Sequence, residues 1–422
     1  MKKTEYKWVI VALCFLMVLT TLGFCSSSRT LFLSPITEAL GIERSKFSLN
    51  DSCRFVSTAI VNIFFGTLVN KFGAKKLIGA GFLSLIGAMI IYATANSIWV
   101  FYIGGVMLGI GLSWTTTTMV GYVVNKWCRE NKGTIMGFVL AANGVGGAVA
   151  TQIVSPIIYD KNDIFGYRKA YLLIAAMLFA VGVLVMIFFR NEPEAKASEK
   201  VKVAHQKSKQ RGKEWEGIEY KDALKTRFFY LACVSIFLTG LVLQGMYGIS
   251  AAHMKDVGID AEYVALVMSV HSVALALFKF LSGFLYDKAG LRTSVNICVF
   301  FAILVSIILA SLTNSAAGKI FAMLYGVFSS AALPLETVML PIYARELFGE
   351  KGFNKVLGIF VSVNTAGYAL GAPLMNLCFD RLNSYRIGLY ACAALMIIVF
   401  IMLQIVITEA KKLQARSYSV RS

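Results

Sequence analysis

Twelve apolar runs divide this 422-residue chain, and each is long enough to cross a membrane. A helix that spans a hydrocarbon layer of ~30 Å needs about 20 mainly apolar residues. Because lipid offers the backbone no hydrogen-bond partners, each run is expected to form a helix. The sequence therefore predicts an all-α membrane protein. Its expected spans lie near residues 8–35, 47–69, 77–95, 98–124, 134–158, 168–189, 228–252, 260–285, 293–312, 319–344, 355–378 and 386–408.

Composition favours the same class. Hydrophobic residues make up 57% of the chain and charged residues only 15%, whereas a soluble domain of this size exposes far more charge. The first run follows a short basic start and is interpreted as a retained helix rather than a cleaved signal peptide. The eight cysteines are scattered without a CxxC pair, so they are expected to act as small hydrophobic residues. A Walker sequence, a metal-ligand cluster and a nucleophile motif are all missing from the sequence, which predicts neither an enzyme nor a cofactor.

The formal charge of +18 is distributed in a way that orients the chain. Basic residues gather between alternate runs, as at Lys71, Lys75 and Lys76, whereas the intervening loop at 95–97 has none. Cytoplasmic loops carry such an excess of Lys and Arg. We therefore expect a multi-pass protein of the cell inner membrane with both termini in the cytoplasm. The lipid bilayer explains the charge, and a nucleic-acid partner is not expected.

Two pairs of similar sequence stretches predict an internal duplication. The stretch from Gly66 to Lys75 resembles the stretch from Gly283 to Arg292 at an offset of 217. Gly137, Asn143 and Gly146 are matched 221 residues later. Two matches at nearly the same offset indicate a repeated six-helix unit. The expected parts are an amino-terminal bundle (1–189), a cytoplasmic linker (190–227), a carboxy-terminal bundle (228–410) and a cytoplasmic tail (411–422).

The repeated Gly-x-Leu-x-Asp-Lys-x-Gly-x-Arg pattern resembles the signature loop of the major facilitator superfamily. The stretch from Lys126-Trp127 to Gly137 is similar to the oxalate–formate antiporter and monocarboxylate transporter branch of that superfamily. The resemblance implies two pseudo-symmetric six-helix bundles, alternating access and gating loops. Asn70 departs from the pattern, which has Asp there. The implied gating residues are Gly66, Asn70, Gly73, Gly283, Asp287, Gly290 and Arg292.

Ionisable and amide side chains inside the apolar runs are the candidate site residues. On insertion scales a charged residue at the centre of a membrane helix costs about 2.5–3.5 kcal/mol, so it needs a cavity, a partner or a role. Two of the candidates, Glu336 and Asp51, are assigned to proton coupling, because burial favours the neutral form of a carboxyl group. The others are assigned to substrate binding: Arg29, Arg54, Lys279, His271, Asn143 and Asn364.

Each assignment has a structural alternative. Lys279 lies where the resemblance implies a substrate-binding arginine, but it could reach the cytoplasmic interface instead. Arg54 could bind an anion or simply pair with Asp51, and His271 could line a cavity or be a satisfied core residue. Glu336 could carry a proton or form a salt bridge to Lys279 or Arg345. Arg29 could draw anions into an outer vestibule or lie at the interface.

The interior charge favours an anionic substrate, because Arg29, Arg54 and Lys279 face only Asp51 and Glu336. The sequence therefore predicts a secondary transporter of small organic anions, mono- or dicarboxylates, that works as a proton symporter or an anion exchanger. The expected partners are that anion and a proton or counter-anion, and a monomer is expected to suffice. The alternatives are a multidrug or hydrophobic-compound exporter of the same fold, and a membrane sensor without transport.

Overall fold

The computed structural model describes residues 3–128, 132–160, 163–190, 217–337, 339–349, 351 and 353–419, which form helices joined by short turns. The first half of the chain contains α1 (Lys3–Val18), η1 (Leu19–Ser27), η2 (Ser28–Phe32), α2 (Leu33–Leu40), α3 (Arg44–Phe72), α4 (Ala74–Thr94), α5 (Ile98–Thr115), α6 (Thr117–Trp127), α7 (Lys132–Ile158) and α8 (Gly166–Phe188). The second half contains α9 (Tyr220–Ala223), α10 (Arg227–Asp256), α11 (Ala261–Ala310), α12 (Ala316–Ala332), α13 (Pro334–Thr337), α14 (Met339–Phe348), α15 (Phe353–Leu382) and α16 (Arg386–Ser419).

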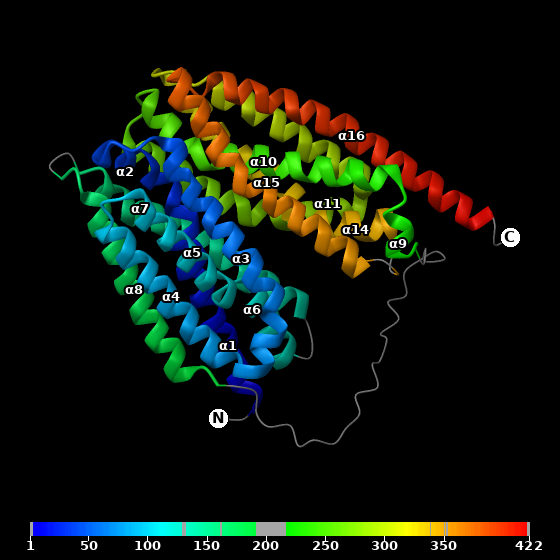
Figure 1. Cartoon of the computed structure of the whole chain (residues 1–422), viewed down its shortest axis with the longest axis horizontal. Helices are drawn as coiled ribbons and strands as arrows, with labels where there is room; N and C mark the ends of the chain where they lie inside the picture. Colours follow the sequence, from blue (N-terminus) through cyan, green and yellow to red (C-terminus); the bar gives the residue numbers. More distant parts are fainter. Residues whose placement is uncertain are drawn as a thin grey trace.

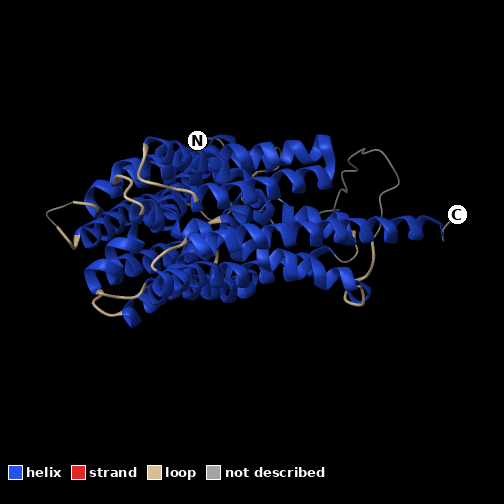
Figure 2. Ribbon diagram, turned by 90° about the horizontal axis from the view of Figure 1, so that it is seen from above, coloured by secondary structure: helices blue, strands red, loops and turns tan. Residues whose placement is uncertain are grey.

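These helices supply twelve membrane spans within the described residues, as the apolar runs predict. The first span is continuous from Tyr6 to Leu40. Helix α11 contains the eighth span (Ala261–Tyr286) and the ninth (Lys288–Ala310), with a break in the backbone at Gly290 near the start of the ninth. None of the described residues lies in a β-strand (Figure 2). Many large apolar side chains on the outer surface are exposed, such as Ile63 and Leu83, which suits contact with lipid tails.

The spans are arranged as two bundles, one from each half of the chain (Figure 1). Helices α1 to α8 form the first bundle, and α10 to α16 form the second. Twelve crossings bring both termini to one side of the membrane, which we call the termini side. The other side, which carries the turns at 41–43, 257–260 and 383–385, is the opposite side.

The described contacts between the bundles lie at mid-height and toward the opposite side. Helix α3 packs against α15, and α7 packs against α11. A Cβ atom added at Gly144 would lie 2.6 Å from the carbonyl oxygen of Ser272, so only glycine permits this approach. Two turns further along α7, Thr151 and Gln152 hydrogen-bond the Ser269 hydroxyl. A Cβ at Gly137, on the termini side of α7, would meet no heavy atom within 4 Å. The bundles correspondingly diverge toward the termini side (Figure 1).

The duplicated loop has the same backbone feature in both halves. Gly73 (φ +80°) separates α3 from α4, and Gly290 (φ +77°) interrupts α11 at the matching position. This left-handed φ is accessible to glycine at little cost, which explains why the pattern has glycine at both places. Arg292 donates hydrogen bonds to Gln404 and Thr408 of α16, each at 2.9 Å. The surroundings of two further gating residues, Gly283 and Asp287, lie outside what the structure describes.

The expected linker is described only in part. Residues 191–216 lie outside the described residues, and α9 lies in the part that follows. The amide of Ile218 donates to the carbonyl oxygen of Phe348 (3.0 Å), so the end of this segment is attached to the second bundle. The residues assigned to the tail continue α16 as far as Ser419.

Candidate functional site

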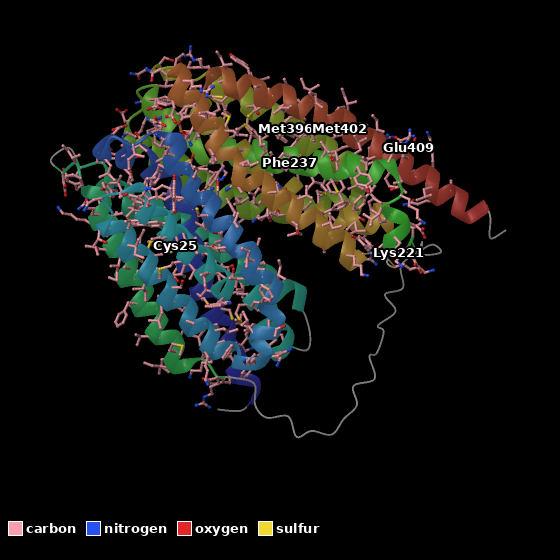
Figure 3. The ribbon with its side chains drawn as sticks, in the orientation of Figure 1. Cys25, Lys221, Phe237, Met396, Met402 and Glu409 are labelled. Carbon is pink, nitrogen blue, oxygen red and sulfur yellow. The ribbon has the colours of Figure 1, made fainter. Side chains whose placement is uncertain are left out.

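The first membrane span departs from α-helical geometry where the candidate site begins. After Val18 it widens into a π-helical stretch, η1, and then tightens into the 3-10 turn η2. A Cβ at Gly23 would lie 2.5 Å from the backbone of Gly146, so η1 and α7 touch backbone to backbone. Irregular turns inside helices are common at functional sites. Here the irregular segment carries Cys25, which is buried in the first bundle (Figure 3), and it also contains Arg29.

Arg29 and Arg54 share a single carboxylate. The guanidinium of Arg29 donates to Asp51, and Nε of Arg54 lies 3.3 Å from the other carboxylate oxygen of Asp51. Asp51 and Arg54 lie three residues apart on one face of α3, as the sequence predicts. Nη1 of Arg54 also donates to the hydroxyl of Ser26 (3.1 Å). Two cations therefore face one anion, and the cluster has an excess of one positive charge.

Several N–H groups of these arginines have no hydrogen-bond acceptor. Nε and Nη2 of Arg29 are buried without one, and Nε of Arg54 is close to Asp51 but poorly aligned for a hydrogen bond. The side chains of Arg29 and Arg54 are only 12% and 5% exposed. A buried donor without an acceptor is costly, and more so when it is charged. The cluster is therefore incomplete as it stands and suits an additional acceptor.

The second bundle covers this cluster with aromatic and hydroxyl groups. The ring of Tyr247 on α10 lies 5.6 Å from the Arg29 guanidinium, and its hydroxyl donates to the carbonyl oxygen of Ser27 (2.9 Å). The ring of His271 on α11 also stacks on Tyr247, with 5.1 Å between the ring centroids. Nδ1 of His271 contacts the hydroxyl of Ser329 (2.8 Å), and Nε2 is buried without a partner. His271 is thus only half satisfied.

Glu336 and Lys279 form a second group inside the second bundle. Glu336 lies in α13, after the helix break at Leu333, and is 5% exposed with Oε1 unpartnered. Lys279 on α11 and Tyr368 on α15 are the neighbours that act on its carboxyl group. Asn364, one turn before Tyr368, is also buried, and its Oδ1 has no partner. One positive charge faces one negative charge here, so this group is balanced.

Aromatic contacts connect the two groups across the interface between the bundles. The Arg54 guanidinium lies 4.2 Å from the ring centroid of Phe55, and Phe55 is 5.3 Å from the ring of Tyr368. Asn143 joins the first group through Ser27, whose hydroxyl donates to its Oδ1 (3.1 Å). The structure therefore brings Arg29, Asp51, Arg54, Asn143 and His271 around η1. It places Lys279, Glu336 and Asn364 in a neighbouring group.

The cavities beside the arginines are small in this conformation. One of about 40 Å³ lies inside the first bundle and is lined by Arg29 and Asp51. Another of about 20 Å³ lies between the bundles and adds Gly248 and Ala372 to the same two residues. Volumes of this size suit one to a few water molecules. An organic anion would therefore need the surrounding side chains or helices to move apart.

Sequence reasoning missed a cluster that joins the bundles on the opposite side. The Arg44 guanidinium donates twice to Asp256, and the backbone amides of Arg44 and Ser45 donate to Asp380 at 3.1 and 2.8 Å. Asp380 thus caps α3 from the other half of the chain. In the sequence these charges stand at helix ends beside other charged residues and look like ordinary loop residues. Sequence spacing therefore gave no signal for this cluster.

Comparison with known proteins agrees with this architecture. The model of the Major Facilitator Superfamily matches residues 9–251 and 232–421. The uncharacterized MFS-type transporter YcxA of Bacillus subtilis is 24% identical over 95% of this chain and 94% of its own length. Human monocarboxylate transporter 2 is 22% identical (92% and 83%), and multidrug resistance protein 2 of Bacillus subtilis is 23% identical (80% of each).

A solved structure supports the fold alone. The crystal structure of the nucleoside transporter NupG superposes with a TM-score of 0.73 at 13% identity, over 95% of this chain and 98% of that chain. The segments matched by the family model extend from the first span to the last and include both bundles. The chain belongs to the Major Facilitator Superfamily and is a multi-pass membrane transporter rather than an enzyme.

Proposed function

We propose that this transporter moves small organic anions, mono- or dicarboxylates, by alternating access between its two bundles. The observation that carries the proposal is the sharing of Asp51 by Arg29 and Arg54. Their excess positive charge is buried, and several of their N–H groups point to no acceptor. A carboxylate brings both the compensating charge and the acceptors, and Arg–carboxylate pairs are among the stronger hydrogen bonds in proteins.

The residues around the arginines support a substrate with an apolar body. Phe55 and Tyr247 present ring faces beside the two guanidinium groups, and His271, which stacks on Tyr247, offers an unpartnered ring nitrogen. Asn364 offers a further amide from α15. The similarity to monocarboxylate transporter 2 is consistent with this substrate class.

Glu336 is the proposed proton-coupling group. Its carboxyl is buried, has one unpartnered oxygen and lies within electrostatic reach of Lys279. Protonation of Glu336 would leave Lys279 uncompensated and so favour an anion nearby. Because protonation of Glu336 and binding of the anion favour each other, the two are transported together as a proton symport. If Glu336 keeps its charge throughout the cycle, the transporter exchanges anions instead. Asp51 remains a second candidate for coupling.

The proposal also includes which side of the transporter faces the cytoplasm and which side is closed in this conformation. The excess of Lys and Arg in the loops on the termini side supports a cytoplasmic location for that side. The bundles meet toward the opposite side, so this conformation is closed toward the exterior. The functional parts are the bundles 1–189 and 228–410, the linker 190–227 and the tail 411–422, and a monomer is sufficient.

Counterflow in proteoliposomes tests the proposal. The purified chain is reconstituted into liposomes that are loaded with an unlabelled carboxylate of one or two charges. Uptake of the same compound in labelled form is then measured with and without a pH gradient. We expect stimulated uptake for at least one carboxylate and none for a lipophilic cation. A multidrug exporter would show the reverse preference, and a sensor would show no flux.

A further inference from the structure

Each bundle has a pocket at the same place on the termini side. The first, of about 270 Å³, is lined by Asn70, Gly73, Ala74, Lys126, Trp127 and Arg190 among others. The second, of about 180 Å³, is lined by Gly290, Leu291, Arg292, Glu346, Leu347 and Lys411 among others. Gly73 and Gly290 are 217 residues apart, and Lys126 and Glu346 are 220 apart. The two pockets are therefore copies of one feature of the repeated unit.

The duplication has diverged in charge. The first pocket has two cations, Lys126 and Arg190, and an amide at Asn70, and none of its described lining residues is acidic. In the second pocket Glu346 stands at the position of Lys126. Its carboxylate accepts a hydrogen bond from Tyr286, and Arg292 is already bonded to α16. The second pocket thus has a carboxylate beside its cations Arg292 and Lys411, whereas cations are the only charged residues in the described lining of the first.

The first pocket lies at the level of lipid headgroups. The spans around it end at Phe72, Val124 and Phe188 and begin at Ala74. Aromatic rings hold its cations: Lys126 lies 4.8 Å from the ring centroid of Tyr122, and Arg190 lies 4.8 Å from that of Tyr6. Trp and Tyr are typical of the membrane–water boundary, and basic pockets between membrane helices at this level suit lipid phosphates.

We infer that the first pocket binds a phosphate group, and that a headgroup of an anionic lipid supplies it. Lys126 and Arg190 provide the positive charge, and Asn70 removes the negative charge that the duplicated loop has at Asp287. A free phosphate ion has the same chemistry, but a lipid is already concentrated where the pocket opens. The second pocket, with Glu346 at the equivalent place, is not expected to bind the same group.

Lipid binding to the full-length chain tests this inference. Native mass spectrometry counts bound phosphatidylglycerol, or phosphatidylcholine with the same acyl chains, on the purified protein in detergent. Titration calorimetry measures the binding of sodium phosphate to the same protein. We expect phosphatidylglycerol to be retained in preference to phosphatidylcholine, and sodium phosphate to bind more weakly than phosphatidylglycerol. Equal retention of the two lipids by a protein that does not bind sodium phosphate overturns the inference, and equal retention together with phosphate binding overturns its lipid source.

Exchanging the charges between the pockets locates the site. Lys126→Glu is expected to weaken phosphatidylglycerol binding at least about fivefold, because it removes one basic contact at an anionic surface and adds a repelling carboxylate. Asn70→Asp and Arg190→Gln should weaken it too, while Glu346→Lys should add a second bound lipid. Lys221→Gln, an exposed change on α9 (Figure 3), is the control. Thermal unfolding confirms that each variant is folded. If folded Lys126→Glu and Arg190→Gln proteins bind the lipid like the control, the inference is wrong.

Discussion

Arg44 of the first bundle and Asp256 of the second form an ion pair that joins the bundles on the opposite side, with the arginine buried and the aspartate partly exposed. The Arg44 side chain is 8% exposed, and its guanidinium lies 4.0 Å from the ring centroid of Phe379. A hydrogen bond to a charged group typically contributes about 1.5–3 kcal/mol. Because this pair connects the bundles, that energy stabilises the conformation that is closed on the opposite side.

Arg44→Gln should therefore shift the protein toward opening on the opposite side. Spin labels at Ser97 and Ala317, in a background without the native cysteines, would report the separation of the bundles by pulsed electron paramagnetic resonance. We expect a new population at longer distance. Lys46→Gln is the matched control, because Lys46 forms an exposed pair with Glu43 on the same side, and such pairs contribute little. An unchanged distance distribution in Arg44→Gln would show that the ion pair does not hold this side closed.

Gly144 and Gly137 offer a test of the packing between α7 and α11. Both substitutions by alanine have the same effect on helix propensity. In Gly144→Ala the new methyl group would lie 2.6 Å from the carbonyl oxygen of Ser272, and overpacking of this kind costs about 1–3 kcal/mol. Gly137→Ala meets no heavy atom within 4 Å. Thermal unfolding should show a lower midpoint for Gly144→Ala alone, and equal midpoints would contradict the described contact.

The ring of Tyr247 is expected to matter more than its hydroxyl. Tyr247→Phe keeps the stacking on His271 and the ring beside Arg29, and loses one hydrogen bond to Ser27, a net loss of about 0.5–1.5 kcal/mol. Tyr247→Leu removes both aromatic contacts. Substrate affinity, measured by calorimetry on the purified transporter, should fall further for Tyr247→Leu. The reverse order would mean that the hydroxyl makes the important contact.

Glu336→Gln separates proton coupling from anion binding. The substitution keeps the size of the side chain but removes the group that can exchange a proton. We expect uptake driven by a pH gradient to be lost while counterflow without a gradient continues. Glu346→Gln, an exposed carboxyl on the termini side, is the control. If the Glu336→Gln variant still shows uptake driven by the pH gradient, another residue carries the coupled proton, and Asp51 is the next candidate.

The sequence predicted the parts of this structure that depend on local pattern. The length of the apolar runs predicted the spans, and the repeated loop pattern predicted the two bundles. The three-residue spacing of Asp51 and Arg54 predicted that their side chains meet.

The remaining features depend on contacts between distant residues. Arg44 and Asp256 are 212 positions apart, and neither lies in a recognisable motif. The irregular turns of η1 and η2 contain no proline, and they follow from the close packing of Gly23 on Gly146. The sequence predicted one cavity lined by all the charged residues, whereas the structure divides them into an unbalanced arginine group and a balanced Lys279–Glu336 group.

The balance of charge at Arg29, Asp51 and Arg54 is the central claim, and counterflow of the favoured carboxylate tests it most directly. Arg54→Gln leaves Arg29 neutralised by Asp51, so uptake efficiency should fall about tenfold to a hundredfold, from the loss of ~1.5–3 kcal/mol for a hydrogen bond to a charged group. The double variant Arg54→Gln/Asp51→Asn restores one excess positive charge at Arg29. We expect it to recover part of the lost counterflow. Wild-type counterflow by Arg54→Gln, or a folded double variant no better than the single one, would contradict the claim.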